Sequence, residues 1–173
     1  MSTVRINFKK LVPEAVKPTK AHDNDAGFDM VAISKKVTEQ YTQYGTGIAM
    51  EIPDGMVGLI FPRSSITKKD LMLKNSVGVI DSGYRGEISF RFYNIVTSIK
   101  SYSRQEYNTT NGYLEPSTIK SLIYNGNQQE YILGDKIGQI IFQKLPDVIL
   151  LETEELDDSE RGEGGYGSTD KKE

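Results

Sequence analysis

The chain has no cysteine and one histidine, His22, in 173 residues. Without cysteine it can form no disulfide framework, no thiolate metal site and no cysteine nucleophile. The single histidine excludes a histidine-based zinc site, and it leaves a Ser-His-Asp triad available only through His22, which lies in a polar turn and is expected to be solvated. Several common classes of catalytic and metal centre are therefore excluded.

Long apolar runs and strong positive charge are also lacking. No window approaches the roughly 18 apolar residues of a membrane-spanning helix, and the first residues lack the charged and apolar regions of a signal peptide. The formal net charge of −3 argues against a general nucleic-acid binder, because such binding depends on Lys and Arg neutralising phosphates. We therefore expect a cytoplasmic enzyme or binding protein with no membrane partner and no direct nucleic-acid partner.

Short apolar or alternating runs separated by Gly and Pro recur along the chain. The length of 173 residues and the 37% hydrophobic content fit one domain with its own core. Because long helical periodicity is absent, the pattern predicts an all-β sandwich or barrel. The expected strands are 4–8, 29–34, 37–42, 46–52, 56–61, 71–74, 77–80, 87–93, 131–133, 136–143 and 148–151, with one helical turn in 65–70.

Two segments depart from this pattern. Residues 95–129 are polar and contain the turn signals Asn111-Gly112 and Asn125-Gly126, which predicts an inserted small hairpin or subdomain, or a long functional loop. Residues 157–173 have almost nothing to bury and are expected to be mobile on their own. We therefore divide the chain into a β domain, 1–156, and a C-terminal arm, 157–173.

Residues 78–87 predict a β-hairpin with a small pocket. An apolar run reaches Asp81, the chain turns on Ser82-Gly83, and Tyr84 follows. A carboxylate and an aromatic ring at the mouth of a hairpin can surround one small ligand. The alternative is a polar turn whose aspartate bonds to its own backbone.

Two other stretches suit a phosphate group. Pro62-Arg63-Ser64-Ser65 follows an apolar strand and offers a guanidinium, two hydroxyls and backbone amides, although an ordinary strand-to-turn transition is the alternative. The arm places Arg161, Ser168 and Thr169 around four glycines, with no Walker motif. Tyr166 among those glycines suits stacking on a flat ligand. The alternative for the arm is a flexible terminus with no role.

Gln139 and Asp29 each stand beside an apolar run. A polar side chain in that position can face a site or can face solvent. The sequence leaves both possibilities open for these two residues.

Taken in order, these stretches resemble the motifs of homotrimeric deoxyuridine triphosphatases (dUTPases), and the match spans nearly the whole chain. The resemblance implies a jelly-roll-like β protomer and a homotrimer with active sites at subunit boundaries, each closed by the arm of another subunit. The matching stretches are Ala26-Gly27-Phe28-Asp29, Pro62-Arg63-Ser64-Ser65, Gly78-Val79-Ile80-Asp81 with Tyr84-Arg85-Gly86, Gly134-Asp135-Lys136-Ile137-Gly138-Gln139, and Arg161-Gly162 with Gly165-Tyr166-Gly167-Ser168-Thr169.

The resemblance further implies Mg²⁺-assisted hydrolysis of dUTP to dUMP and pyrophosphate, which keeps uracil out of DNA and supplies dUMP. Asp81 would be the general base for the water that attacks the α-phosphate. Asp29 would support Mg²⁺ indirectly, through water. Tyr84 would pack against the deoxyribose and leave no room for a 2′-hydroxyl.

The other roles that the resemblance implies are contacts with the substrate. Tyr166 would stack on the uracil. The backbone that would pair with the uracil edge belongs to Gly78, Val79 and Ile80. The residues that would hold phosphates and the attacking water are Arg63, Ser64, Ser65 and Gln139. Those of the arm that would close on the γ-phosphate are Arg161, Gly167, Ser168 and Thr169.

The sequence departs from the family pattern at several positions. Tyr166 stands where phenylalanine is usual, Lys136 where arginine is common, and Asp170 where glycine is common, which adds a negative charge near the γ-phosphate. The gap between the third and fourth motifs is longer by about 25–30 residues, which makes 95–129 a long insertion of the kind that is usually functional or disordered.

The insertion resembles that of staphylococcal bacteriophage dUTPases, some of which bind a pathogenicity-island repressor. This resemblance implies an alternative role as a nucleotide-gated regulatory module that binds a repressor protein through 95–129, alongside catalysis. A weaker alternative is deoxycytidine triphosphate deaminase, which shares the fold and the Arg-Ser-Ser motif. That enzyme uses a glutamate where this chain has Asp81, and ammonia release from dCTP would distinguish the two activities.

Overall fold

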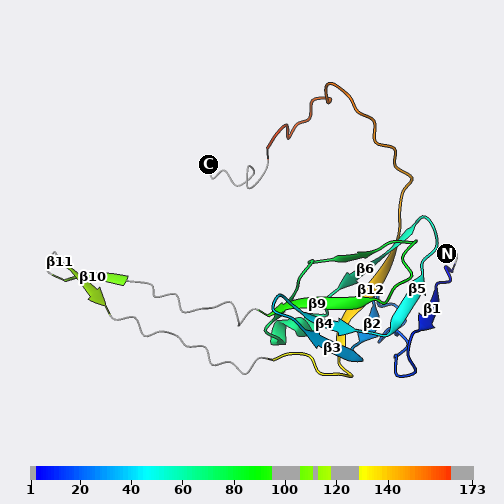
Figure 1. Ribbon diagram of the computed structural model, residues 1–173. Coiled ribbons are helices and arrows are strands. Elements are labelled where there is room, and N and C mark those ends of the chain that lie inside the picture. Colours follow the sequence, from blue (N-terminus) through cyan, green and yellow to red (C-terminus); the bar gives the residue numbers. More distant parts are fainter. Residues whose placement is uncertain (1–2, 95–105, 111–112, 118–128, 165–173) are drawn as a thin grey trace.

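Two four-stranded antiparallel sheets enclose one hydrophobic core in the computed structural model, which describes residues 3–94, 106–110, 113–117 and 129–164 (Figure 1). One sheet has the order β2 (Phe28–Val31), β12 (Lys136–Lys144), β6 (Met56–Phe61), β8 (Gly78–Ile80). The other has the order β3 (Ser34–Val37), β4 (Thr42–Gly45), β9 (Ser89–Asn94), β7 (Leu71–Leu73). Two further pairs are β1 (Asn7–Lys10) with β5 (Ile48–Glu51), and β10 (Glu106–Thr110) with β11 (Tyr113–Ser117).

Strand β6 begins where the sequence has its clearest turn, Pro53-Asp54-Gly55. Gly55 has φ +73°, a left-handed conformation that glycine adopts at little cost, and the Met56 amide donates to the Pro53 carbonyl at 3.2 Å. The strand then pairs with β12 from Met56 opposite Lys144 to Phe61 opposite Gln139. This ladder places the end of β6 at Phe61 beside Gln139, near the start of β12.

The core lies between the two four-stranded sheets. Side chains from both sheets form one buried cluster, and they include Met30, Ile60, Ile137, Ile140, Tyr44, Phe90 and Phe92. Strand β12 approaches β9 closely at Gly138, where an added Cβ would lie 2.1 Å from Cε1 of Phe90. The β12–β2 ladder also shifts register between Lys136 and Gly138. A glycine at this position therefore lets β12 pack closely against Phe90, next to the register shift in its ladder with β2.

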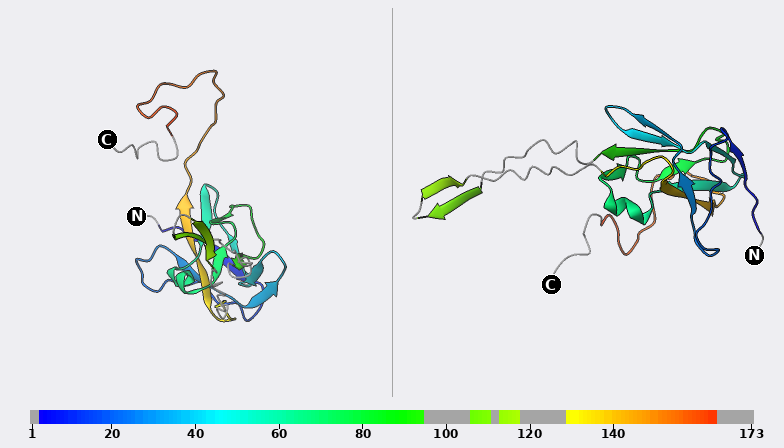
Figure 2. Two further views of the ribbon diagram at one scale, coloured as in Figure 1. Left: turned by 90° about the vertical axis from the view of Figure 1, so that its left-hand side faces the viewer. Right: turned by 90° about the horizontal axis from the view of Figure 1, so that it is seen from below.

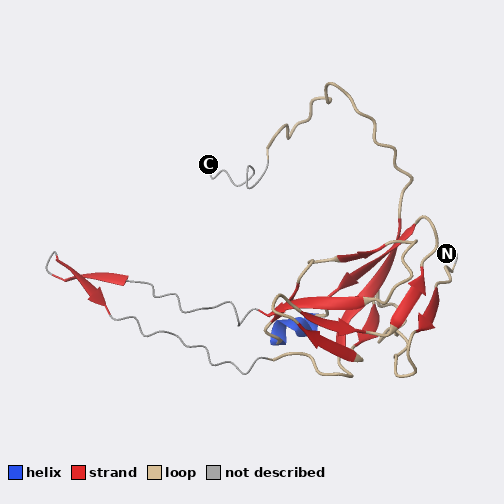
Figure 3. Ribbon diagram, viewed as in Figure 1, coloured by secondary structure: helices blue, strands red, loops and turns tan. Residues whose placement is uncertain are grey.

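The prediction of an all-β sandwich is confirmed for the described residues. Figure 3 shows one helical element, the 3₁₀ helix Ser64–Lys68, which confirms the helical turn expected in 65–70. No helix in the described ranges is long and apolar enough to cross a membrane.

Three expected strands are wrong. Residues 38–41 form a turn, closed by the Thr38 hydroxyl that donates to the Tyr41 carbonyl at 2.8 Å, so this stretch links β3 to β4. Residues 131–133 lead into another turn, in which the Asp135 carboxylate accepts from the Ile132 amide at 3.0 Å. Residues 148–151 have no ladder partner in the described chain and leave the body with the arm (Figure 2).

The insertion and the arm are described in part. Strands β10 and β11 lie within 95–129 and pair with each other, with Thr110 opposite Tyr113. The predicted turn Asn111-Gly112 lies outside the described residues. Residues 95–105, 118–128 and 165–173 lie outside the described residues. The division into a β domain and an arm stays a prediction.

Candidate active site

Asp81 and Tyr84 lie in the chain reversal 78–87 (the hairpin), which begins with the edge strand β8. The prediction that its two arms pair with each other is wrong, because β8 pairs with β6 in one sheet and β9 pairs with β4 and β7 in the other. Strand β8 pairs with β6, with Gly78 opposite Ile60 and Ile80 opposite Gly58. The Tyr84 amide donates to the Asp81 carbonyl at 3.1 Å, and its hydroxyl donates to the Glu87 carbonyl at 3.0 Å. These bonds close the turn and hold the tyrosine ring against the returning chain.

A cavity of about 530 Å³ lies beside this hairpin. Its walls include Asp81 and Tyr84, as the sequence predicts, together with Gly78, Val79 and Ile80. A cavity of this size suits a small ligand with one flat and one polar part.

The Asp81 carboxylate faces solvent at the mouth of this cavity. It forms no ion pair with any described residue, and no hydrogen bond to its side chain is found in that part of the chain. A carboxylate without a committed partner remains available to accept a proton from water.

A second group of predicted residues gathers at the other end of β6. Asp29 on β2 is 7% exposed, and its two carboxylate oxygens pair with two cations. The Arg63 Nε lies 2.7 Å from one oxygen, and the Lys136 Nζ lies 2.8 Å from the other. The carboxylate therefore holds Arg63 and Lys136 side by side.

Gln139 lies next to this ion-paired group because of the strand register. It pairs with Asp29 on β2 and with Phe61 on β6. Its side-chain amide donates to the Pro62 carbonyl at 3.3 Å. A Cβ on Gly27 would lie 2.2 Å from Oε1 of Gln139, so the glycine is needed for this close approach. Gln139 is thus half-buried beside the ion-paired group, and its role in a site stays a prediction.

Ser64 and Ser65 open the 3₁₀ helix directly after Arg63. Arg63 has an extended backbone, φ −88° and ψ 161°, and its carbonyl accepts from the Ile66 amide at 3.0 Å. Ser64 is exposed and Ser65 is half-buried. The ion-paired group consists of Asp29, Arg63 and Lys136, and Gln139 lies beside it. Together with these two serines, these residues form one polar surface.

The dUTPase family model matches residues 14–104 of the chain. The deoxyuridine 5'-triphosphate nucleotidohydrolase of Rhodococcus erythropolis is 35% identical over 167 residues, which cover 95% of this chain and 85% of the relative. That of Corynebacterium glutamicum is 36% identical over 169 residues, with 96% and 95% covered. The chain belongs to the dUTPase family.

Solved dUTPase structures of staphylococcal phages have the same fold. The Staphylococcus bacteriophage 80alpha dUTPase with dUpNHpp superposes with a TM-score of 0.71 at 29% identity, over 96% of this chain and 98% of the other. The dUTPase from phage phi11 of S. aureus, in a structure that shows its species-specific insert, has a TM-score of 0.64 at 25% identity, with 90% and 100% covered. The resemblance to phage dUTPases is confirmed.

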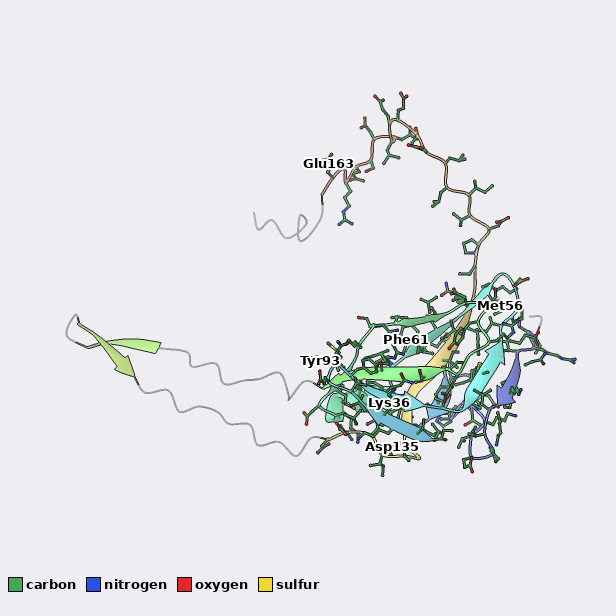
Figure 4. The ribbon with its side chains drawn as sticks, viewed as in Figure 1. Lys36, Met56, Phe61, Tyr93, Asp135 and Glu163 are labelled. Carbon is green, nitrogen blue, oxygen red and sulfur yellow. The ribbon has the colours of Figure 1, made fainter. Side chains whose placement is uncertain are left out.

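The residues of the fifth dUTPase motif are described only at their start. Arg161 is exposed, and its Nε donates to the Gly164 carbonyl at 2.8 Å. Figure 4 shows Glu163 on the arm, away from the strands. Tyr166, Gly167, Ser168, Thr169 and Asp170 lie outside the described residues, so their roles stay predictions.

The cavity beside the hairpin also has walls that the sequence did not point to. They are Gln40, Tyr41, Ile60, Lys74, Asn75, Ser89 and Arg91. Strand β9 pairs with both β4 and β7, and these pairings bring the residues together from three parts of the chain. No local motif marks them, and only the register of β9 could have identified them.

Proposed function

We propose that the chain hydrolyses dUTP to dUMP and pyrophosphate. The observation that carries the proposal is the cavity beside the hairpin, with the unpartnered Asp81 carboxylate at its mouth, in a chain of the dUTPase family. The carboxylate orients a water molecule and takes its proton as the water attacks the α-phosphorus. General-base action of this kind contributes about 10²–10⁴-fold to a rate.

Selection of the nucleotide follows from the walls of the cavity. The backbone of Gly78 and Ile80 offers hydrogen-bonding groups to the uracil edge, and an unmatched buried donor or acceptor on a wrong base costs about 1–3 kcal/mol. The Tyr84 ring, held by its bond to Glu87, blocks the space of a ribose 2′-hydroxyl. The substrate is therefore a deoxyuridine nucleotide.

Arg63, Ser64, Ser65 and Gln139 bind the phosphates in this proposal. The Arg63 guanidinium has one nitrogen committed to Asp29, so its remaining N–H groups are available to phosphate oxygens. Asp29 orients the guanidinium that does so. The exposed hydroxyl of Ser64 and the half-buried one of Ser65 add neutral donors beside it.

Family members typically depend on Mg²⁺, and the phage phi11 dUTPase coordinates a structural Mg(II) ion. In the described ranges no group of three acidic or histidine side chains could hold a metal, and both oxygens of Asp29 are paired with cations. These donors fit an ion carried mainly by triphosphate and water, which Mg²⁺ prefers. When bound, Mg²⁺ would offset phosphate charge, with Asp29 as an indirect support through water.

We also infer that the active site takes residues from more than one copy of the chain, in a homotrimer. Ile80 pairs with Gly58, whereas Arg63 lies five residues further along the chain, beyond the other end of β6. At ~3.3 Å per residue this separates the two groups by about 16 Å. That is too far for both to contact one α-phosphate, so the hairpin of one copy would face the phosphate-binding residues of another.

Pyrophosphate release tests the activity. The protein should hydrolyse dUTP and leave dCTP, dTTP and UTP almost untouched, without releasing ammonia from dCTP. Hydrolysis of all four nucleotides at similar rates would contradict the proposed selection of uracil by the cavity. Ammonia release would instead support a deaminase.

Mixing two inactive variants tests the shared site. Asp81→Asn and Arg63→Ala should each be inactive alone, and a refolded mixture should regain part of the activity because some sites then combine two intact halves. A mixture that stays inactive, while light scattering shows mixed trimers, would contradict a site shared between copies.

A second function, as a regulatory module that binds a repressor protein through 95–129, is favoured by the neighbours in structure. The phage 80alpha dUTPase is described as controlling transfer of virulence genes and as inducing a pathogenicity island, SaPI. Both ends of the insertion stand at neighbouring residues, since Asn94 pairs with Leu71 and the Gln129 carbonyl accepts from the Asp70 amide at 3.3 Å. A short glycine linker can therefore replace 95–128.

The deletion variant separates the two functions. It should hydrolyse dUTP at nearly the normal rate and lose binding to the repressor in a pull-down from purified proteins. Unchanged repressor binding would contradict a role of the insertion. The cytoplasmic location stays a prediction.

A further inference from the structure

Tyr131 lies directly after the insertion and is buried against the aromatic core. Its side chain is 2% exposed, and its ring packs against Tyr44 and Phe92 with centroid distances of 6.0 Å and 5.5 Å. Its hydroxyl has no hydrogen-bond partner among the described residues. Buried hydroxyls are nearly always paired, so an unpaired one needs an explanation.

The neighbouring tyrosine shows the usual arrangement. The Tyr44 hydroxyl is also buried, and it donates to the Tyr131 carbonyl at 3.0 Å. Burial raises the pKa of Tyr44 to about 12. Two adjacent buried tyrosines thus differ in one respect, because one hydroxyl has a partner and the other does not.

The unpaired hydroxyl points to the residues that are proposed to bind phosphate. Burial raises the pKa of the Tyr131 hydroxyl, while the nearby Ser65 side chain and the Arg63 guanidinium act in the opposite direction. Ser65 is therefore the hydroxyl's neighbour, although the two form no hydrogen bond of normal geometry.

The backbone beside Tyr131 is fixed to the other end of the same helix. The Lys69 Nζ donates to the Glu130 carbonyl at 3.0 Å and lies 5.2 Å above the Tyr131 ring centroid. Asp70 and Gln129 exchange two hydrogen bonds, at 3.3 Å and 3.2 Å. The segment that carries Tyr131 is therefore anchored at both Lys69 and Asp70, whereas Ser65 is half-buried at the start of the helix.

We propose that Tyr131 is a positioning residue, whose hydroxyl donates a hydrogen bond to Ser65 Oγ while the Ser65 hydroxyl donates its own proton to a phosphate oxygen. A serine has one proton to give and two lone pairs that accept, so both bonds can exist together. Hydrogen bonds in such a chain strengthen one another. The inference rests on the proposed role of Ser65 in binding phosphate.

The test compares Tyr131→Phe with the wild type in two measurements. Without nucleotide, Tyr131→Phe should have an equal or higher Tm, because it removes an unpaired buried hydroxyl. With dUTP, its kcat/KM should fall about 3- to 10-fold, the factor that one neutral hydrogen bond represents. The rise in Tm caused by the imido analogue dUpNHpp should also be smaller.

Tyr44→Phe is the matched control. It removes a neighbouring buried hydroxyl that has a partner, so it should lower the Tm without nucleotide and keep the Tm rise caused by dUpNHpp. The double variant Tyr131→Phe/Ser65→Ala should lose no more activity than Ser65→Ala, because the tyrosine acts only through the serine.

Three results with the Tyr131→Phe variants would overturn the proposal. They are an unchanged kcat/KM in Tyr131→Phe, additive losses in the double variant, or a lower Tm with an unchanged effect of dUpNHpp. Ser65→Ala should also keep the Tm without nucleotide, and a clear drop would overturn the proposal without the tyrosine variant. A wild type that fails to hydrolyse dUTP would contradict the proposed function, whereas these outcomes contradict the role of Tyr131 in an active enzyme.

Discussion

Asp29 lies on β2 and Asp81 directly follows β8, the two edge strands of one sheet. The carboxylates of these two residues have opposite surroundings. Asp81 is exposed and has no partner within the described residues, whereas Asp29 is buried and pairs with Arg63 at 2.7 Å and Lys136 at 2.8 Å. An unpartnered carboxylate can move a proton, and a doubly paired one cannot do so without losing its partners. Asp81 is therefore suited to proton transfer, and Asp29 is suited to holding Arg63 and Lys136 in place.

The largest expected effect is on the unpartnered carboxylate. Asp81→Asn should lower the kcat for dUTP by about 10²–10⁴-fold, because the amide cannot take a proton from water. The Tm should stay the same, since the side chain contacts no partner in the described chain. Pyrophosphate release and thermal unfolding measure the two effects. Asp54→Asn, in the exposed turn before β6, is the control, and a nearly normal rate in Asp81→Asn would remove the general base from the mechanism.

The next effect tests the paired carboxylate. Asp29→Ala should lower the free energy of unfolding by about 3 kcal/mol, because it leaves two neighbouring cations without their counter-charge. This is the low end for a buried pair, since Arg63 and Lys136 are 32% and 45% exposed. Urea denaturation at one fixed protein concentration measures it, because the proposed trimer would make stability depend on concentration.

The exposed ion pair between Arg85 and Glu51 is the control for this change. Its atoms are 3.9 Å apart and both side chains are more than half exposed. Glu51→Ala should therefore cost less than about 1 kcal/mol. If Asp29→Ala lowers the free energy of unfolding no more than Glu51→Ala does, the ion pairs of Asp29 do not stabilise the fold more than an exposed ion pair does.

A smaller effect is expected where a glycine supports the paired group. Gly27→Ala should lower kcat/KM about 10-fold, because its Cβ would lie 2.2 Å from Oε1 of Gln139 and would displace that side chain. Gly83→Ala, in the turn after Asp81, meets nothing within 4 Å and should change kcat/KM less than about twofold. Equal losses in both variants would mean that the hairpin is as tightly constrained as the paired group.

The smallest effect concerns the hairpin itself. Tyr84→Phe removes the bond from its hydroxyl to the Glu87 carbonyl, which is worth about 0.5–1 kcal/mol at an exposed site. The looser ring should raise UTP turnover relative to dUTP by about two- to fivefold. Parallel assays of the two nucleotides measure this ratio. A hundredfold change would mean that the hydroxyl, and not the ring, excludes ribose.

The sequence predicts structure well where the signals are local. Strand β6 has the predicted bounds, because Pro53-Asp54-Gly55 turns the chain before Met56 and Pro62 ends the strand after Phe61. The strand expected at 131–133 is wrong because apolar content alone cannot tell a strand from a turn. Tyr131 is buried without a ladder, whereas Ile132 and Leu133 are exposed.

The candidate site follows the same rule. The family motifs are local signals, and they pointed to Asp81 and Tyr84 beside the cavity, to Asp29 and Arg63 in the ion-paired group, and to Ser64 and Ser65 on the 3₁₀ helix. The pairing of Asp29 with Arg63 and Lys136 was not predicted, because it depends on the register shift at Gly138, which joins parts of the chain far apart in sequence. The same holds for Lys74 and Arg91 in the cavity wall, since the pairing of β7 with β9 places them there.

The apolar run that follows β12 raises a question of solubility during synthesis. Val148, Ile149, Leu150 and Leu151 are 64%, 80%, 92% and 83% exposed. Four consecutive residues of this kind are a seed for intermolecular sheet formation while newly made chains are still separate. Pro146-Asp147 precede them, and Glu152, Glu154 and Glu155 follow closely. Proline and negative charge flanking an apolar run act as gatekeepers against aggregation, so the residues around this run oppose association of its exposed side chains with those of other chains.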